Sequence, residues 1–238
     1  MFYLLFGSIS YLAFFFAFIY FIAFVAEQYV QNHLSLTSKD FDIEALLINV
    51  FLIIFWGVQH SVMARQKFKD KIAKIIPPTI ERSVYVLVTA VVLGVVMWFW
   101  QPMPGVLWHF DGQGMVWLMW SIFFLGWGLV LLSTFLTDHF DLFGLRQVWL
   151  AFLKRTYVPI PFSERWLYQA IRHPMMLGLL MSLWAIPVMT VTHLVFAVGM
   201  SIYIFIGIYF EEKSLQHDLG EDYQQYKKRT KKIFPYFY

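Results

Sequence analysis

The sequence predicts an all-α fold, a polytopic bundle of about six membrane-spanning helices. Three observations lead to this prediction. Of the 238 residues, 60% are hydrophobic and 14% are charged, whereas soluble domains are about half apolar and about a quarter charged. The mean hydropathy is +0.62. The charges gather in blocks between long apolar stretches, as they do in integral membrane proteins. The chain has no cysteine, which excludes disulfides, thiolate nucleophiles and cysteine-bound metals.

Six apolar stretches predict the spans, because about 20 helical residues cross the core of a bilayer. The first stretch starts at Met1 without a basic leader or a cleavage motif, so we expect it to be retained. The last two stretches are the shortest and share the tightest turn. The six stretches cover residues 3–26, 43–64, 84–100, 115–137, 175–190 and 194–210.

Lys and Arg residues are concentrated in every second connection between these stretches. They fill the connections 65–83 and 138–174 and the tail after 212, whereas the alternate connections contain only Lys39. Because cytoplasmic loops are enriched in Lys and Arg, this alternation predicts that both termini lie in the cytoplasm. The net charge of +3 therefore reports topology, and we expect no nucleic-acid partner.

The order of these segments predicts a single membrane domain over residues 1–238. Residues 1–137 hold four N-terminal spans, and 138–174 form a cytoplasmic lid or interfacial segment with many aromatic residues. Residues 175–212 form a helical hairpin. Residues 213–238 form a cytoplasmic tail with a polar helix, which Gly220 breaks.

The stretch Arg172-His173-Pro174 opens the predicted hairpin. Proline is favoured at the first position of a helix, so His173 should lie near the N-cap. The free backbone N–H groups and the positive dipole end at such a helix start can bind a carboxylate or phosphate. Gly178 allows another backbone or a flat ligand to approach closely. The alternative is a plain helix start with a snorkelling arginine.

Glu211 and Glu212 close the same hairpin, at the expected end of its second helix. A hairpin returns to the side from which it started, so the acids should meet His173. Acids at the inner end of a span are usually functional when they face the bundle interior. The alternative is that both face water. Carboxylates beside an anion-binding helix start could hold a zwitterionic ligand that carries a ribose.

This pattern resembles the C-terminal cofactor half of the isoprenylcysteine carboxyl methyltransferase and phospholipid methyltransferase superfamily. The resemblance covers about 65 residues and includes Arg172-His173-Pro174, Gly178, Glu211-Glu212, Leu215, Gly220, Tyr223, Tyr226 and Phe234-Pro235. It implies that Arg172, His173, Pro174, Gly178, Glu211 and Glu212, together with Arg82, bind S-adenosylmethionine on the cytoplasmic side. The superfamily often has tyrosine two residues after the proline. Met176 stands there in this chain, so a tyrosine contact to the cofactor is in doubt.

The upstream half narrows the resemblance. The stretches concerned are Gln59-His60-Ser61-Val62-Met63-Ala64-Arg65, Glu81-Arg82-Ser83-Val84-Tyr85 and Thr137 to Gln147. They resemble the six-span branch that includes nitrite/nitric-oxide-associated membrane proteins. Phe143-Gly144-Leu145-Arg146-Gln147 is most similar to the family of bacterial methanethiol S-methyltransferases, which make dimethyl sulfide from methanethiol. The resemblance implies a small thiol as substrate and the bacterial inner membrane as location.

Methyl transfer from a sulfonium is an in-line displacement, so most of the catalysis comes from positioning. The thiolate is the reactive form of a thiol, and a base or a cationic site can provide it. His139 and His60 are the candidate bases, Arg146 and Arg82 are candidate cationic groups, and Asp138 could orient His139.

Three alternatives stay open. The acceptor of the same chemistry could be a prenylated cysteine, a lipid amine or a larger thiol. A metal could be bound by His60, His139 and His173 with Asp138 or Asp141, but no HxxxH or HxH spacing supports it, and we predict no metal site. The chain could also be a non-catalytic haem or redox partner in denitrification. The sequence does not indicate the oligomeric state.

Overall fold

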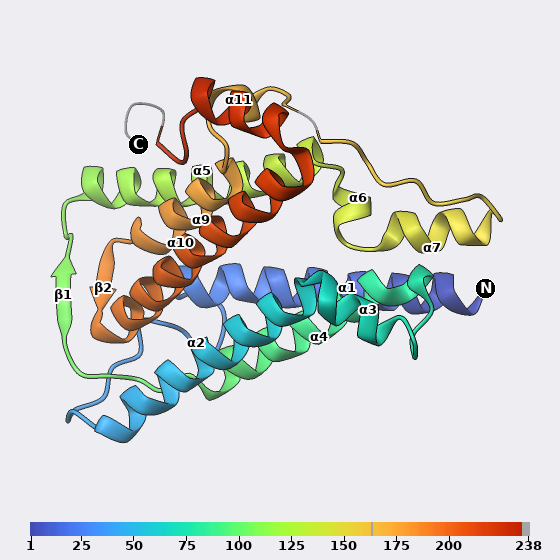
Figure 1. Cartoon of the computed structure of the whole chain (residues 1–238). Helices are drawn as coiled ribbons and strands as arrows, with labels where there is room; N and C mark the ends of the chain where they lie inside the picture. Colours follow the sequence, from blue (N-terminus) through green and yellow to red (C-terminus); the bar gives the residue numbers. More distant parts are fainter. Residues whose placement is uncertain (163, 235–238) are drawn as a thin grey trace. The chain divides into compact units, whose positions relative to one another are not determined.

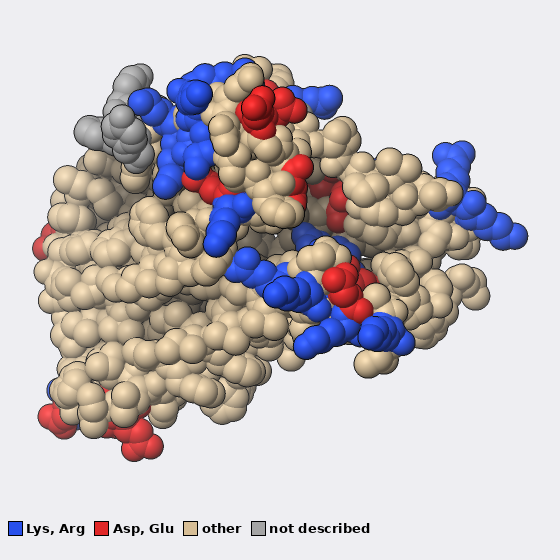
Figure 2. Space-filling view, in the orientation of Figure 1, with Lys and Arg blue, Asp and Glu red and all other residues tan. Residues whose placement is uncertain are grey.

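The computed structural model describes residues 1–162 and 164–234 and is almost wholly helical (Figure 1). Within this described part, five helices are long and apolar enough to cross a membrane. They carry large exposed apolar side chains such as Phe16, Phe51 and Phe124, and Figure 2 shows broad surfaces without charge. The prediction of an all-α polytopic membrane protein is therefore confirmed. The five helices are α1 (Phe2–Ala26), α2 (Ile43–Ala64), α4 (Pro78–Phe99), α5 (Gln113–Leu136) and α10 (Val191–Leu219).

Shorter elements connect the long helices. Two short strands, β1 (Val106–His109) and β2 (Val188–Thr190), pair with each other. The shorter helices are α3 (Gln66–Ile72), α6 (His139–Leu142), α7 (Leu145–Phe152), α8 (Leu167–Ala170), α9 (Pro174–Trp184) and α11 (Glu221–Arg229).

The hairpin predicted over 175–212 is unequal. Helix α9 has 11 residues, so at about 1.5 Å per residue it covers about half of a bilayer core of about 30 Å. The predicted span over 175–190 is therefore wrong in its length. Pro187 lacks the N–H that a continuing helix needs, and the β-branched residues of β2 favour an extended strand.

The second helix of the hairpin is longer than expected. Helix α10 continues to Leu219, so Glu211 and Glu212 lie inside a helix and not at its end. The residues after Glu212 include good helix formers such as Lys, Leu and Gln, which explains the extension. The predicted break at Gly220 is confirmed. Gly220 has φ +57°, a conformation that glycine adopts without strain, and α11 starts directly after it.

The chain divides into two compact units. The first comprises Met1–Gly105, Asp138–Ile160 and Thr190–His193, and the second comprises Val106–Thr137, Pro161–Met189 and Leu194–Tyr238. The sequence did not predict this division, and the functional boundaries predicted within the chain stay predictions.

In the first unit, α4 packs against α1 and α2, and α7 packs against α1 and α4. Val148 of α7 is fully buried, and a Cβ added at Gly7 of α1 would lie 2.6 Å from a Val148 methyl carbon. Trp149 and Phe152 on the same helix are about half exposed. This part of the predicted interfacial segment is therefore an amphipathic helix packed on the spans of its unit.

In the second unit, α5 packs closely against α9. A Cβ added at Gly178 would lie 2.5 Å from the carbonyl oxygen of Gly126, and the hydroxyl of Ser182 donates to the carbonyl oxygen of Phe123 at 3.1 Å. The tail folds back onto the same unit, because Tyr223 and Tyr226 of α11 are almost fully buried. The predicted polar helix of the tail is therefore a packed part of the fold.

Candidate functional site

The start of α9 is held by the chain's own tail. Ile171 and Lys231 form an isolated parallel bridge. The backbone N–H of Arg172 donates to the carbonyl oxygen of Lys231 at 2.8 Å, and that of His173 donates to Lys232 at 3.1 Å. Pro174 follows as the first helical residue, with His173 at the N-cap. The tail therefore fixes the backbone from which the side chains of Arg172 and His173 extend.

Arg172 and Glu212 form a buried ion pair, and each side chain is 8% exposed. Nε of Arg172 donates to Oε1 of Glu212 at 2.8 Å, and its Nη1 donates to the carbonyl oxygens of Lys227 and Thr230. The Lys227 ammonium lies 3.4 Å from the other Glu212 oxygen. Because a buried charge without partners is costly, these contacts make Glu212 and Arg172 stable in a water-poor setting.

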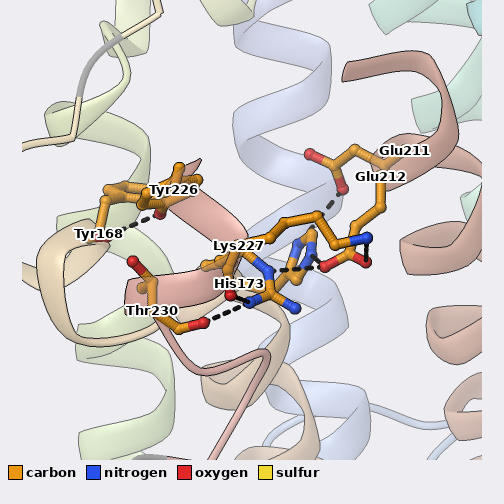
Figure 3. Close-up of polar contacts among 8 residues, drawn as sticks. Tyr168, His173, Glu211, Glu212, Tyr226, Lys227 and Thr230 are labelled. Carbon is orange, nitrogen blue, oxygen red and sulfur yellow. Dashed lines mark hydrogen bonds and ion pairs between the residues drawn. The ribbon is translucent and has the colours of Figure 1, made fainter. Parts of the chain in front are cut away.

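His173 lies between the two acids. Its Nε2 lies 3.2 Å from Oε1 of Glu212, and its Nδ1 lies 3.6 Å from Oε2 of Glu211 (Figure 3). The His173 side chain is 4% exposed. The structure therefore confirms that the His-Pro helix start meets the Glu-Glu pair.

The two acids differ in exposure. The Glu211 side chain is 49% exposed, whereas that of Glu212 is 8% exposed. Glu212 is occupied by Arg172, His173 and Lys227. Glu211 is therefore the acid whose carboxylate is accessible to a ligand. Glu212 is the acid that is held in the buried ion pair with Arg172.

Aromatic side chains close the cluster on the tail side. The hydroxyl of Tyr226 donates to the carbonyl oxygen of Tyr168 at 2.6 Å (Figure 3). Phe162 contacts the rings of Tyr223 and Tyr226 edge-on. Burial, and next the negative charge of Glu211, raises the pKa of Tyr168 to about 12. Burial also raises the pKa values of Tyr223 and Tyr226. These phenols therefore stay neutral at physiological pH.

A small open hollow lies beside the ion pair, with a volume of about 200 Å³. That is smaller than the roughly 300–1,000 Å³ of typical ligand pockets. Its wall combines two ammonium groups with a carboxylate and an amide, so it suits one charged end of a ligand. The lining residues are Tyr209, Glu212, Lys213, Gln216 and Lys227.

Gly178 has a structural explanation. The sequence allowed either another backbone or a flat ligand to approach Gly178 closely, and the structure shows another backbone. The space where a Cβ would lie is filled by Gly126 and Val130 of α5. Gly178 therefore holds α9 against α5. Met176 lies in the same helix, and Pro235 of the tail motif lies outside the described residues.

In the first unit, His139 is buried at the start of α6, where it is 8% exposed. Its Nε2 lies 2.8 Å from the hydroxyl oxygen of Tyr11 in α1. Burial lowers the pKa of His139, and the negative charge of Asp138 opposes this shift. His139 is therefore neutral at pH 7 and can accept a proton.

Asp138 and Arg146 belong to the same unit as His139. Asp138 caps α6, because its Oδ1 accepts from the backbone N–H of Asp141 at 3.0 Å. Nη1 of Arg146 donates to Asp141 at 2.9 Å and to the carbonyl oxygen of Val158 at 3.0 Å. The hydrogen bond that Arg146 donates to the Asp141 carboxylate raises the pKa of Arg146, so the guanidinium stays charged. Its guanidinium carbon also lies 5.3 Å from the centre of the Tyr157 ring.

His60 and Arg82 meet through Tyr85. The hydroxyl of Tyr85 lies 3.0 Å from the His60 ring nitrogens, and the ring of Trp56 stacks on His60. The Arg82 guanidinium lies 5.1 Å from the centre of the Tyr85 ring, and its Nε donates to the carbonyl oxygen of Leu142 at 2.7 Å. The structure therefore brings Arg82 together with His60 and α6 in the first unit, whereas the other predicted cofactor residues belong to the second.

Within residues 1–162 and 164–234, no three His, Asp or Glu side chains gather as a metal ion would require. His60, His139 and His173 thus form no such group with Asp138 or Asp141 in the part of the chain that the structure describes.

Several residues of these clusters were missed from the sequence. Lys227 and Thr230 join the Arg172 cluster only because the tail folds back, which no local pattern predicts. Tyr11 lies in an aromatic run that looks lipid-facing throughout. Asp141 was considered from the sequence only as a metal ligand, and its pair with Arg146 was not predicted. Its place three residues after Asp138 at a helix start could have indicated a cap and its neighbour.

The fold and the clusters define a class: a polytopic integral membrane protein in which a buried ion pair joins a His-Pro helix start to a Glu-Glu pair and a folded-back C-terminal helix. The sequence profile of the family described as NnrU protein matches residues 47–235. The chain belongs to this family, and relatives named methanethiol S-methyltransferase match it over most of its length.

Three relatives illustrate the range. "Methanethiol S-methyltransferase" of Mycobacterium tuberculosis is 41% identical, over 98% of this chain and 96% of the relative. The protein of the same name from Pseudomonas deceptionensis is 45% identical, over 80% of this chain and 73% of the relative. "Nurim" of Xenopus laevis is 29% identical, over 80% and 66% respectively. No solved structure matches the chain.

Proposed function

We propose that this chain is an integral membrane enzyme that methylates methanethiol to dimethyl sulfide, with S-adenosylmethionine as the methyl donor. The observation that carries the proposal is the 41% identity to a methanethiol S-methyltransferase over 98% of this chain and 96% of the relative. Two further proteins of that name, from Crocosphaera subtropica and Pseudomonas deceptionensis, are 41% and 45% identical.

The second unit supplies groups that fit the two charged ends of this donor. The half-exposed carboxylate of Glu211 can accept hydrogen bonds from an ammonium group or from ribose hydroxyls. Lys213 and Lys227 in the wall of the hollow can pair with a carboxylate. When bound, S-adenosylmethionine supplies a methyl group activated by a positively charged sulfur.

In this proposal Glu212 and Arg172 act by holding the site. Their ion pair fixes the start of α9 and orients His173 toward Glu211. Because positioning contributes most to an in-line displacement, a fixed frame is what the reaction needs from these residues. The buried, neutral side chains of Tyr223 and Tyr226 keep water from the buried side of this ion pair.

On the acceptor side, we assign removal of the thiol proton to His139, with His60 as the second candidate. The pKa of His139 is lowered by burial, so its imidazole is neutral and can accept the S–H proton. The thiol sulfur then bonds to the methyl carbon as the bond from that carbon to the donor sulfur breaks. Arg146 stays a candidate for stabilising the thiolate, and Asp138 for opposing the charge on the imidazolium.

Purified protein in lipid nanodiscs tests the proposal. With S-adenosylmethionine and methanethiol, we expect dimethyl sulfide in the headspace at a rate that depends on enzyme concentration. His173→Ala, Glu211→Ala and Arg146→Ala should each lose at least tenfold in donor affinity or rate, which corresponds to about 1.4 kcal/mol. Glu221→Ala, which removes an exposed acid of α11, should retain wild-type activity.

Absence of dimethyl sulfide under these conditions would refute the methanethiol assignment. Assays with a prenylated cysteine and with a phospholipid amine then distinguish another acceptor from a non-catalytic protein. A Soret band in the purified protein would favour the haem or redox alternative.

We also propose that the protein lies in the bacterial inner membrane with both termini in the cytoplasm. The basic segments 65–83 and 213–232 support this orientation through the enrichment of Lys and Arg in cytoplasmic loops. The chain has no cysteine, so single cysteines can report topology directly. Cysteines at Lys71 and Lys228 should resist a membrane-impermeant maleimide in intact cells, whereas one at Asp40 should react.

A further inference from the structure

Tyr11 of α1 contacts His139 although the two are far apart in sequence. The Tyr11 hydroxyl oxygen lies 2.8 Å from Nε2 of His139, and the two rings meet edge to face with their centres 5.8 Å apart. Both residues belong to the first unit. Tyr11 is partly buried and His139 is 8% exposed, so the contact lies largely out of water.

Aromatic rings hold the two side chains in place. Phe143 lies edge-on to His139 with ring centres 4.9 Å apart, and it stacks on Phe14 at 4.1 Å. Phe140 contacts the other side of the imidazole edge-on at 5.4 Å. Ring packing fixes where the imidazole lies, but it does not choose which edge of the imidazole faces Tyr11. That choice falls to a polar contact.

The Tyr11 hydroxyl is such a contact. It can donate to Nε2 when that nitrogen is bare, or accept from Nε2 when it is protonated. In either case the hydrogen bond keeps Nε2 turned toward Tyr11, whichever tautomer the neutral imidazole adopts. In the imidazolium form Nε2 carries a proton, so the hydroxyl oxygen can only accept.

We propose that Tyr11 is a positioning residue for the methyl transfer proposed above: its hydroxyl fixes the orientation of the His139 ring. The inference rests on the proposed function, since it needs His139 to act as the base.

The charged groups near His139 are the same in the wild type and in the Tyr11→Phe variant. Asp138 precedes the ring on its own segment and opposes its loss of a proton. From the packed elements, Asp141 and Arg146 form a pair of their own, and Arg82 of α4 donates to the backbone of α6. A Tyr11→Phe substitution leaves these charges unchanged and keeps the ring contacts, so it removes only the hydroxyl.

The test compares Tyr11→Phe with Tyr3→Phe, the same change on a more exposed tyrosine of the same helix. The measured quantities are kcat and KM for methanethiol over about pH 5.5 to 9, and the Kd for S-adenosylhomocysteine. We expect Tyr11→Phe to lower kcat/KM for the thiol about five- to tenfold and to shift its acidic limb. The Kd should not change, and Tyr3→Phe should match the wild type in all three.

The inference is overturned if Tyr11→Phe keeps both the wild-type kcat/KM and the wild-type acidic limb. It is also overturned if the loss appears only as weaker binding of S-adenosylhomocysteine. If the wild-type protein makes no dimethyl sulfide at all, it is the proposed function that fails. A measurement that does not need turnover distinguishes this case from failure of the inference about Tyr11.

That readout is the ¹⁵N spectrum of labelled histidine, with the His139 signals identified from a His139→Gln variant. One set of His139 signals in the wild type, and broadened or doubled signals in Tyr11→Phe, would support the role of the hydroxyl. Doubled His139 signals already in the wild type would overturn it, whether or not Tyr11→Phe folds well.

Discussion

Replacing each acid of the Glu211-Glu212 pair by glutamine should separate holding the fold from binding the ligand. Glu212→Gln keeps the size of the side chain but removes the charge that faces Arg172, His173 and Lys227. Glu211→Gln makes the same chemical change one residue earlier, at a side chain that is 49% exposed. The pair therefore provides its own matched control.

The expected cost at Glu212 follows from burial. Removing one partner of a buried ion pair typically costs about 3–5 kcal/mol, because the remaining charge loses its compensation. Arg172 is 8% exposed and keeps its hydrogen bonds to the carbonyl oxygens of Lys227 and Thr230. We therefore take the lower end, about 3 kcal/mol, which corresponds to about 6–12 °C in Tm at about 2–4 °C per kcal/mol.

Two measurements decide the matter. Thermal unfolding in detergent, followed by the fluorescence of the 10 tryptophans, should show the large drop for Glu212→Gln and a change of about 2 °C or less for Glu211→Gln. Titration with S-adenosylhomocysteine should show the reverse order, with at least about tenfold weaker binding for folded Glu211→Gln. Equal Tm values for the two variants would refute the division of roles.

Three further predictions concern packing, charge and pH. Gly178→Ala should lose about 1–3 kcal/mol of stability, because its Cβ would meet a backbone oxygen of α5. Gly128→Ala, which has open space, should lose none, and equal Tm values would contradict the close packing. Asp141→Asn should lower stability by about 1 kcal/mol or less, because its pair with Arg146 is partly exposed; a drop above about 10 °C in Tm would contradict this. The pKa of His139 lies below its ordinary value of 6.5 when folded, so the unfolded chain binds a proton first as the pH falls, and stability decreases below about pH 6.5. His139→Gln should reduce the difference in Tm between about pH 7.5 and 5.5, and an unchanged difference would exclude this contribution.

The membrane helices could be predicted because their signal is local. A stretch such as 43–64 is long enough and apolar enough to identify itself, and its predicted bounds equal those of α2. The start of α4 was predicted six residues late, since its first turn is polar and begins at Pro78. Hydropathy reports where a helix meets lipid, whereas the helix itself begins where a cap allows it.

The short α9 shows where this signal stops. The stretch 175–190 is apolar throughout, so hydropathy alone predicts a span. Pro187 and the β-branched residues after it end the helix early. Sequence could have indicated this limit, because a proline 13 residues into a predicted helix was present in the pattern.

The meeting of His173 with the acid pair was predictable for a topological reason, since a hairpin returns to its starting side. The role of the tail was not. The bridge between Ile171 and Lys231 joins segments 60 residues apart, and it places Lys227 and Thr230 on Arg172. Such pairing depends on tertiary packing of Tyr223 and Tyr226, and no turn or cap signal precedes it.

The division between Glu211 and Glu212 follows from helix geometry. Successive residues of an α-helix point about 100° apart, so two neighbouring acids cannot both point at Arg172. Once Glu212 points at Arg172, Glu211 must point away toward solvent, which agrees with their exposures of 8% and 49%. His173 can contact both because its two ring nitrogens lie on opposite sides of the imidazole. The extension of α10 through both acids, which the sequence analysis did not predict, is therefore what gives each acid a separate role.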